Sequence, residues 1–190
     1  MLEKIEEYAK INDVPIMQKE AMEFLVDFIK KNNIKDILEI GTAIGYSAIN
    51  MCLISNDIKV TTIERDEARY KQAIKNIKEF NLDDQINLIY GDALEENITG
   101  SYDLIFIDAA KAQNKNFFNK YSPLLKKGKY IITDNLNFHG LVGEDTTNLS
   151  RNLKQLVRKI KDYIEFLKQN KDYDTTFYDV GDGISISVKK

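Results

Sequence analysis

The sequence predicts an α/β protein built on a doubly wound sheet of seven mostly parallel strands. Short apolar runs of strand length alternate with longer segments of helical period, and the last two runs flank a tight turn. The 190 residues are enough for one domain with a core of its own, and they contain no linker or low-complexity tract. We therefore expect one domain over residues 1–190, with an N-terminal helical segment over about 1–31 and the doubly wound core over about 35–190.

The elements follow one another in the order that a parallel sheet requires. Helical period begins in Met17–Lys31, which places Met22, Leu25, Val26 and Ile29 on one face. The runs that we interpret as the first five strands are Asp36–Ile40, Ile58–Ile63, Ile86–Tyr90, Leu104–Ile107 and Tyr130–Thr133. Helical segments separate them near Tyr46–Ile54, Arg69–Phe80 and Ala112–Leu125. This alternation is typical of β-α-β units, and we consider the strand order 3-2-1-4-5.

The last part of the chain departs from that alternation. A long charged helix is expected over about Asn148–Asn170. Two strand-like runs, Thr175–Val180 and Ile184–Val188, then flank the turn Gly181-Asp182-Gly183. Such a short connection joins antiparallel strands, so the sequence predicts a C-terminal hairpin.

Composition restricts the function classes. The net charge of −3 gives no global attraction to nucleic acid, so an RNA-binding role has to rest on other observations. The single cysteine, Cys52, excludes an internal disulfide and a multi-cysteine metal site, and its apolar helical setting predicts a buried thiol. No apolar run approaches the roughly 18 residues of a membrane span, and the start MLEKIEEYAK lacks a secretory apolar region. We expect a cytoplasmic protein with no membrane partner.

The stretch LEIGTAIGYSAI runs from a strand through two glycines into a helix. Gly41 and Gly45 allow the backbone to turn tightly and to approach a ligand such as a nucleotide or a carboxylate. The dinucleotide fingerprint requires G-x-G-x-x-G, whereas Ala43 and Tyr46 occupy the positions of its second and third glycines. A nicotinamide cofactor is therefore disfavoured.

Acidic residues at the next strand ends suggest which ligand the turn holds. Glu64 ends the second strand, where a carboxylate can accept hydrogen bonds from both ribose hydroxyls, and Asp92 with Ala93 follows the third strand. An adenosine end without phosphates fits S-adenosyl-L-methionine. The alternative is that the glycines only make a turn and that Glu64 is a solvated acid.

A second group follows strands four and five. Asp108 ends LIFID, and Asp134 with Asn135 ends IITDN. If these strands are neighbours, two carboxylates and an amide oxygen meet, and such ligands favour a hard cation such as Mg²⁺. The alternative is that Asp108 and Asn135 cap the segments that follow.

Lys111 lies three residues after Asp108 and is a candidate general base. A nearby divalent cation would lower the pKa of its ammonium group, so that it could accept a proton from a substrate hydroxyl. The alternative is an ordinary surface lysine.

Six ordered motifs resemble the catechol O-methyltransferase-like, metal-dependent O-methyltransferases. The resemblance runs from about Val14 to the C-terminus and rests on LEIGTAIGYSAI, TIERDE, GDAL, LIFIDAAK, ITDN and VGDGISIS. More narrowly, VPIM, DNLNFHGLV and VGDGISIS resemble the bacterial member that converts 5-hydroxyuridine to 5-methoxyuridine at the wobble position of tRNA. The resemblance implies the Rossmann-like fold of class I S-adenosylmethionine-dependent methyltransferases and a homodimer.

The resemblance also implies roles for individual residues. Those that would contact S-adenosylmethionine are Met17, Ser47, Glu64, Asp92, Ala93 and Asp108. Those that would ligate Mg²⁺ are Asp108, Asp134 and Asn135, and the lysine that matches Lys111 is the base in catechol-methylating relatives. We expect an O-methyltransferase whose substrate is the anticodon region of tRNA.

Other functions stay open at this point. A catechol and 5-hydroxyuridine both offer two adjacent oxygens to a metal, so a small catechol or phenol is the alternative substrate. The chain has no tryptophan, although in animal catechol enzymes tryptophans line the site of the aromatic ring.

A non-catalytic RNA-binding protein is a third hypothesis. The basic residues of the last long helix could meet phosphates or form a solvated face; they are Arg151, Lys154, Arg158, Lys159 and Lys161. Phe138 and His139 could lie beside a flipped base.

Overall fold

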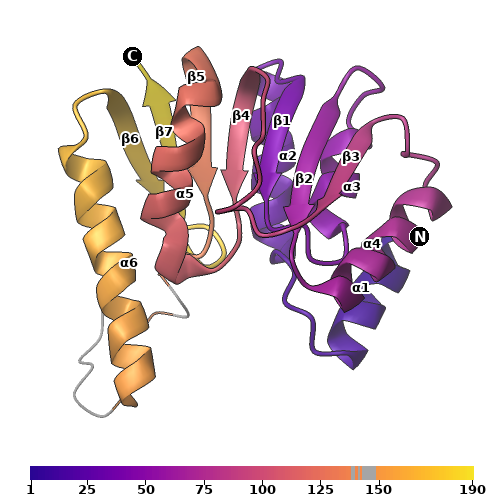
Figure 1. The fold of residues 1–190 in the computed structure, drawn as a ribbon, viewed down its shortest axis with the longest axis horizontal. Helices are drawn as coiled ribbons and strands as arrows, with labels where there is room; N and C mark the ends of the chain where they lie inside the picture. The colour runs from indigo at the N-terminus through magenta and orange to yellow at the C-terminus, as the bar shows by residue number, and fades with distance from the viewer. Residues whose placement is uncertain (138–139, 141, 143–148) are drawn as a thin grey trace.

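A seven-stranded sheet forms the centre of the computed structural model, which describes residues 1–137, 140, 142 and 149–190. The strands are β1 (Asp36–Ile40), β2 (Lys59–Glu64), β3 (Ile86–Tyr90), β4 (Tyr102–Ile107), β5 (Leu125–Thr133), β6 (Tyr173–Tyr178) and β7 (Ile184–Lys189). Their order across the sheet is β3-β2-β1-β4-β5-β7-β6 (Figure 1). The first five strands pair in parallel, and β7 pairs antiparallel with both β5 and β6. The predicted doubly wound sheet, its 3-2-1-4-5 order and its C-terminal hairpin are confirmed.

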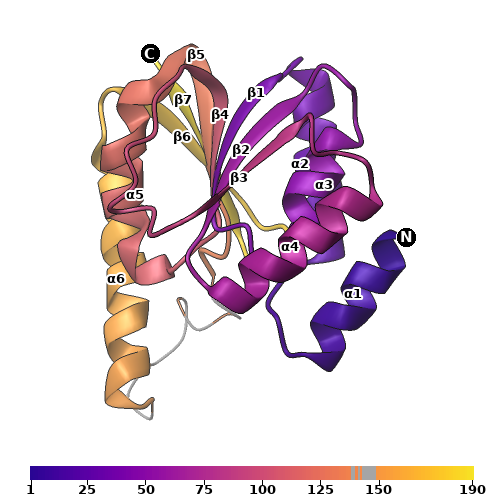
Figure 2. The same ribbon diagram turned by 45° about the vertical axis from the view of Figure 1, so that its right-hand side comes forward.

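Helices cover both faces of this sheet. The α-helices are α1 (Leu2–Ile11), α2 (Lys19–Lys31), α3 (Tyr46–Cys52), α4 (Glu67–Glu79), α5 (Asn114–Tyr121) and α6 (Arg151–Gln169). Two short 3-10 turns, η1 (Lys111–Gln113) and η2 (Ser122–Leu124), flank α5. Figure 2 shows α1 to α4 on one face and α5 with α6 on the other. No helix among the described residues is long and apolar enough to cross a membrane.

Two predicted helical segments are interrupted. The N-terminal segment consists of α1 and α2, because Asp13 adopts a left-handed backbone and Pro15 follows it. The predicted helix near Ala112–Leu125 is wrong in its last four residues, where Pro123 lies in the tight turn η2 and Leu125 already begins β5. Proline has no N–H to donate to a continuing helix, so the chain leaves the helical path there.

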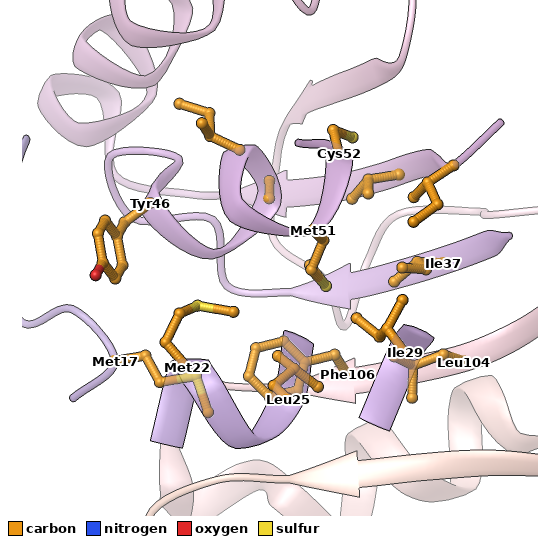
Figure 3. Packing of buried hydrophobic residues seen from close by; sticks show 14 of the residues in the cluster. Met17, Met22, Leu25, Ile29, Ile37, Tyr46, Met51, Cys52, Leu104 and Phe106 are labelled. Atoms are coloured by element: carbon orange, nitrogen blue, oxygen red, sulfur yellow. The ribbon is translucent and has the colours of Figure 1, made fainter. Parts of the chain in front are cut away.

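The core on the α1–α4 side is formed by apolar side chains from α2, α3 and the sheet. Figure 3 shows Leu25 and Ile29 of α2 close to Phe106 of β4, with Met51 of α3 above them. Cys52 is buried as predicted, and desolvation followed by the charge of Glu39 raises the pKa of its thiol to about 12. This thiol therefore stays protonated and unreactive at neutral pH. A second cluster fills the space between the sheet and α5 with α6.

The ends of β1 and β4 approach each other closely at Gly41. Gly41 has φ +101°, and a Cβ atom there would lie 2.2 Å from the carbonyl oxygen of Asp108. The Asp108 N–H donates to the carbonyl of Ile40 at 2.9 Å, which fixes the two strand ends together. A side chain at position 41 would meet backbone, which cannot rotate away.

Substituting Gly41→Ala tests this contact, with Gly128→Ala as the matched control. Gly128 also has positive φ (+72°), but nothing lies within 4 Å of its would-be Cβ. We expect Gly128→Ala to cost about 1 kcal/mol from backbone strain, and Gly41→Ala to cost roughly 3 kcal/mol or more because a steric clash is added. Urea unfolding measures both, and equal costs would show that the close approach is not limiting.

Candidate functional site

A pocket of about 420 Å³ opens at the carboxyl ends of the parallel strands. Its walls come from the α1–α2 linker, the β1–α3 turn and the segments that follow β2, β3, β4 and β5. The residues predicted for the site that line it are Met17, Gly41, Ser47, Glu64, Asp92, Ala93, Asp108, Lys111 and Asn135. Asp134 is not in the wall; it is buried next to Asn135, with 3% of its surface exposed. The topology thus brings together residues that are up to 118 positions apart, from Met17 to Asn135.

The β1–α3 turn and the end of β2 are joined by Glu64. This side chain is 7% exposed, so it is not the solvated acid of the alternative interpretation. Its Oε2 accepts a hydrogen bond from the Ala43 N–H at 2.7 Å, and its Oε1 accepts one from the Asp66 N–H at 2.8 Å. Each carboxylate oxygen keeps a second lone pair for a ligand donor.

The segment after β3 forms the neighbouring wall. Asp92 Oδ1 accepts a hydrogen bond from the Leu94 N–H at 2.8 Å, and Asp92 Oδ2 lies 3.5 Å from Nη1 of Arg65. The carbonyl of Ala93 accepts a hydrogen bond from the Tyr121 hydroxyl at 2.5 Å. These bonds tie the turn to α5 and fix the backbone of Ala93 against the pocket.

The N-terminal helix reaches the same pocket through Tyr46. The Tyr46 side chain is buried and lines the wall, and its hydroxyl donates to Oε1 of Glu6 in α1 at 2.8 Å. Burial, and next the hydrogen bond with Glu6, raises the pKa of the Tyr46 phenol. Since Tyr46 is the first residue of α3, α1 helps to position the helix that carries Ser47.

A buried network behind the pocket was missed by sequence reasoning. Glu39, in the middle of β1, has none of its surface exposed, and it accepts hydrogen bonds from Ser47 Oγ and Thr62 Oγ1, each at 2.5 Å. Burial raises its pKa to about 7 against the opposing effect of these two hydroxyls. The signal in the sequence was the charged residue inside the apolar run ILEI. Glu39 holds Ser47 in place at the pocket wall.

Asp108, Asp134 and Asn135 form the second part of the site. Nδ2 of Asn135 lies 3.3 Å from Asp108 Oδ1 and 2.8 Å from Asp134 Oδ2. Asp134 Oδ1 is buried without a hydrogen-bond partner among the described residues. Burial, and after it the charge of Asp108, raises the pKa of Asp134 to about 7. Burial also raises the pKa of Asp108, although Lys111 and Asn135 oppose this.

The donor set fits a hard cation. Two acids are held together where their negative charges are poorly solvated, and one buried oxygen has no partner; a cation would relieve both conditions. No group of three or more His, Cys, Asp or Glu side chains is gathered for a metal within the described part of the chain, so an amide would have to be the third ligand. Asp108 also accepts no capping hydrogen bond from the described residues of η1 or α5, in contrast to the alternative role as an N-cap.

The β6–β7 turn holds this cluster in place. The N–H groups of Leu136 and Asn137 donate to the carbonyls of Gly183 and Asp182 at 2.9 and 2.7 Å. A Cβ at Gly183 would lie 2.9 Å from the Asn137 nitrogen, so a side chain there would displace the segment. The VGDG turn between β6 and β7 and the ITDN segment at the end of β5 therefore form one packed unit. Phe138 and His139, considered for a flipped base, lie outside the described residues.

Glu39 generates a prediction about the pH dependence of stability. Its folded-state pKa of about 7 exceeds its ordinary value of 4.5, so the folded chain retains a proton that the unfolded chain releases between these pH values. The free energy of unfolding therefore has the full contribution of this group below pH 4.5. It falls as pH rises, by up to about 3 kcal/mol at pH 7. Glu39→Gln, which mimics the protonated acid, should lose that part of the pH dependence.

Urea unfolding at a series of pH values measures the effect. Glu79→Gln, at an exposed position of α4, is the control and should leave the profile unchanged. A Glu39→Gln profile as steep as that of the unaltered protein would contradict the assignment.

Comparisons with known proteins give a consistent result. The profile of a family described as O-methyltransferase matches residues 1–190. The caffeoyl-CoA O-methyltransferase of Medicago sativa is 30% identical over 177 residues, which cover 86% of this chain and 70% of the relative. A structure from Staphylococcus aureus, named "a putative caffeoyl-CoA O-methyltransferase", has a TM-score of 0.95 and 45% identity, and covers 100% of this chain and 92% of that chain. The O-methyltransferase from Bacillus cereus in complex with SAH has a TM-score of 0.84 and 28% identity, covering 100% and 90%.

Proposed function

This chain belongs to the O-methyltransferase family, and we therefore propose that it transfers a methyl group from S-adenosylmethionine to a substrate hydroxyl with the help of Mg²⁺. The observation that carries the proposal is a pocket whose wall joins Glu64 and Asp92 to Asp108 and Asn135, with Asp134 buried next to Asn135. We further propose that the hydroxyl belongs to 5-hydroxyuridine at the wobble position of tRNA, and that the product is 5-methoxyuridine.

The pocket walls support the choice of methyl donor. The Bacillus cereus relative is known in complex with SAH. In this chain the free lone pairs of Glu64 would accept the ribose hydroxyls, with Asp92 and Ala93 beside the adenine end. Ser47, Met17 and Gly41 would contact the methionine end. The donor supplies an activated methyl group on a positively charged sulfur.

The acidic cluster would hold the metal. Asp108 and Asp134 contribute carboxylate oxygens, and a half-turn of the Asn135 amide would direct Oδ1 instead of Nδ2 toward them. When bound, Mg²⁺ supplies positive charge that favours ionisation of a substrate hydroxyl.

Lys111 would receive the proton. It lines the pocket three residues after Asp108, close enough for its charge to lower the pKa of that acid. The remaining contribution of the chain is orientation: the walls hold the ionised oxygen in line with the methyl group and its sulfur, and they exclude water. Inversion at the methyl carbon follows.

The substrate proposal rests on shared chemistry and on the narrower motif resemblance. The 5-hydroxyl of 5-hydroxyuridine lies beside a carbonyl, so it offers the same pair of adjacent oxygens as a catechol. A small catechol or phenol is the second candidate, and the caffeoyl-CoA O-methyltransferase names of several relatives favour testing it.

Methyl transfer from labelled S-adenosylmethionine tests the proposal directly. With Mg²⁺ and tRNA rich in 5-hydroxyuridine, we expect 5-methoxyuridine in the nucleosides analysed by mass spectrometry; a simple catechol is assayed in parallel. Product from catechol alone would leave the O-methyltransferase proposal standing and overturn the tRNA substrate. No product from either substrate would overturn both.

The metal cluster is tested by removal and substitution. We expect chelation to abolish methyl transfer and Mg²⁺ to restore it. Mg²⁺ should also raise the melting temperature, since a ligand at one hundred times its Kd stabilises the folded state by about 2.7 kcal/mol. Asp134→Ala should lose that rise, whereas Asp174→Ala, at an exposed position of β6, should retain it. The same rise in both variants would place the metal elsewhere.

The role of Lys111 is tested with Lys111→Met, with Lys115→Met in the adjacent helix α5 as control. Loss of a general base lowers the rate by about 10² to 10⁴-fold, and the loss should shrink as pH rises and the substrate hydroxyl ionises by itself. The pH–rate profile with catechol measures this. A rate equal to that of the control would rule out the base role.

A further inference from the structure

One face of the first half of α6 is basic, and we propose that it binds the phosphate backbone of the RNA substrate. We call Arg151, Lys154, Arg158 and Lys161 the α6 basic face. The inference rests on the proposed function, because it assigns a surface to the substrate that the pocket would methylate.

The α6 basic face is continuous and turned to solvent. Its members recur at spacings of three, four and three residues, which places them in one row along an α-helix. All four are exposed, whereas Val157 and Ile160 are buried against the rest of the protein. With a rise of 1.5 Å per residue the row is about 15 Å long, enough to follow a stretch of single-stranded backbone.

The same helix provides an internal comparison. Residues 151–161 contain five basic side chains and no Asp or Glu. The second half of α6 instead mixes charges: Asp162 and Glu165 appear there, and Lys168 pairs with Glu165 at 2.8 Å. A merely solvated helix face has mixed charges of this kind. The first half therefore differs from an ordinary solvated face in a way that favours an anionic partner.

Three of the basic side chains are not engaged by other described side chains. Arg151, Arg158 and Lys161 form no ion pair or hydrogen bond with any residue in the described part of the chain. Arg151 and Lys154 lie in the first turn, which contains no acidic residue. Cations near a helix N-terminus oppose the helix dipole and cost about 0.3–1 kcal/mol each. Helix stability does not explain their placement, whereas binding of phosphates does.

The position of the α6 basic face relative to the pocket is the third argument. α6 packs against η1, which begins with Lys111 of the pocket wall. Figures 1 and 2 show the start of α6 extending beyond the edge at which the parallel strands end, on the side where the pocket opens. A nucleotide in the pocket would thus bring its neighbours in the same RNA loop near the basic row. The protein as a whole is negatively charged, so attraction has to come from such a local surface.

The experiment compares two triple variants that change the net charge equally. One is Arg151→Gln/Arg158→Gln/Lys161→Gln. The control is Lys75→Gln/Lys168→Gln/Lys171→Gln, which removes three cations outside the α6 basic face. Melting temperatures verify that both fold. Binding of a tRNA anticodon stem-loop is measured by fluorescence anisotropy over a series of salt concentrations, and methylation of catechol is measured in the same preparations.

We expect the first variant to bind the stem-loop at least about tenfold more weakly at low salt. Its plot of log K against log salt should be shallower by about 2, because each lost phosphate contact to single-stranded nucleic acid removes about 0.7. The control should bind like the unaltered protein, and catechol methylation should be unchanged in both.

Three results would overturn the inference. Equal weakening in both variants would show a general charge effect, and unchanged binding in the first variant would show that RNA contacts another surface. In either case retained methylation of catechol would leave the O-methyltransferase proposal intact. Absence of stem-loop binding by the unaltered protein would overturn the inference together with the tRNA substrate, and methylation of catechol would again report separately on the reaction site.

Discussion

Two acidic side chains, Asp108 and Asp134, are held together by the register of neighbouring strands, and the rest of the site depends on this constraint. Ile107 of β4 pairs with Thr133 of β5, and the Asp134 N–H donates to the carbonyl of Ile107 at 3.2 Å. The residues that follow these strands therefore have to be neighbours. Their charges are disfavoured by burial, and the charge of Asp108 further disfavours that of Asp134, so a cation at this edge of the sheet would relieve both conditions.

The same strand register connects the acidic pair with the part of the pocket proposed to hold the adenosine of the methyl donor. Ile40 pairs with Ile63 on one side and with Ile107 on the other, so Gly41, Glu64 and Asp108 follow three adjacent strands in one row. Glycine is the residue type that fits at position 41, because a side chain there would meet the Asp108 carbonyl. A methyl donor that contacts Glu64 thereby also reaches the acidic pair.

The row of strand ends could be predicted from the sequence because it depends on local signals. Apolar runs of fixed length each end in a glycine or an acid, and parallel strands place those ends at one edge. Glu39 could not be interpreted in this way, since the residues that satisfy its carboxylate lie 8 and 23 positions away and are recognised only after folding. The predicted helical segment extends two residues past Pro123, whereas α5 ends at Tyr121 and Leu125 already belongs to β5, because sequence signals fix a helix end only to within one or two residues. The sequence leaves two interpretations of the basic residues of α6, phosphate binding and a solvated face, because it does not show which of them are exposed in one row.

Under the proposed function, the acidic pair of Asp108 with Asp134 and the basic helix face would address two different parts of one electrostatic problem. An RNA substrate would be repelled by these two acids and by the net charge of −3, whereas a neutral catechol would not. A cation between Asp108 and Asp134 removes the repulsion only where the reacting oxygen binds, because its effect is screened within about 10 Å at moderate ionic strength. The backbone on either side of the nucleotide needs its own positive surface, and the α6 basic face lies outside the reaction site. If both proposals hold, recognition of RNA and the methyl-transfer chemistry would be separable in this fold, and a small substrate would use the pocket without α6.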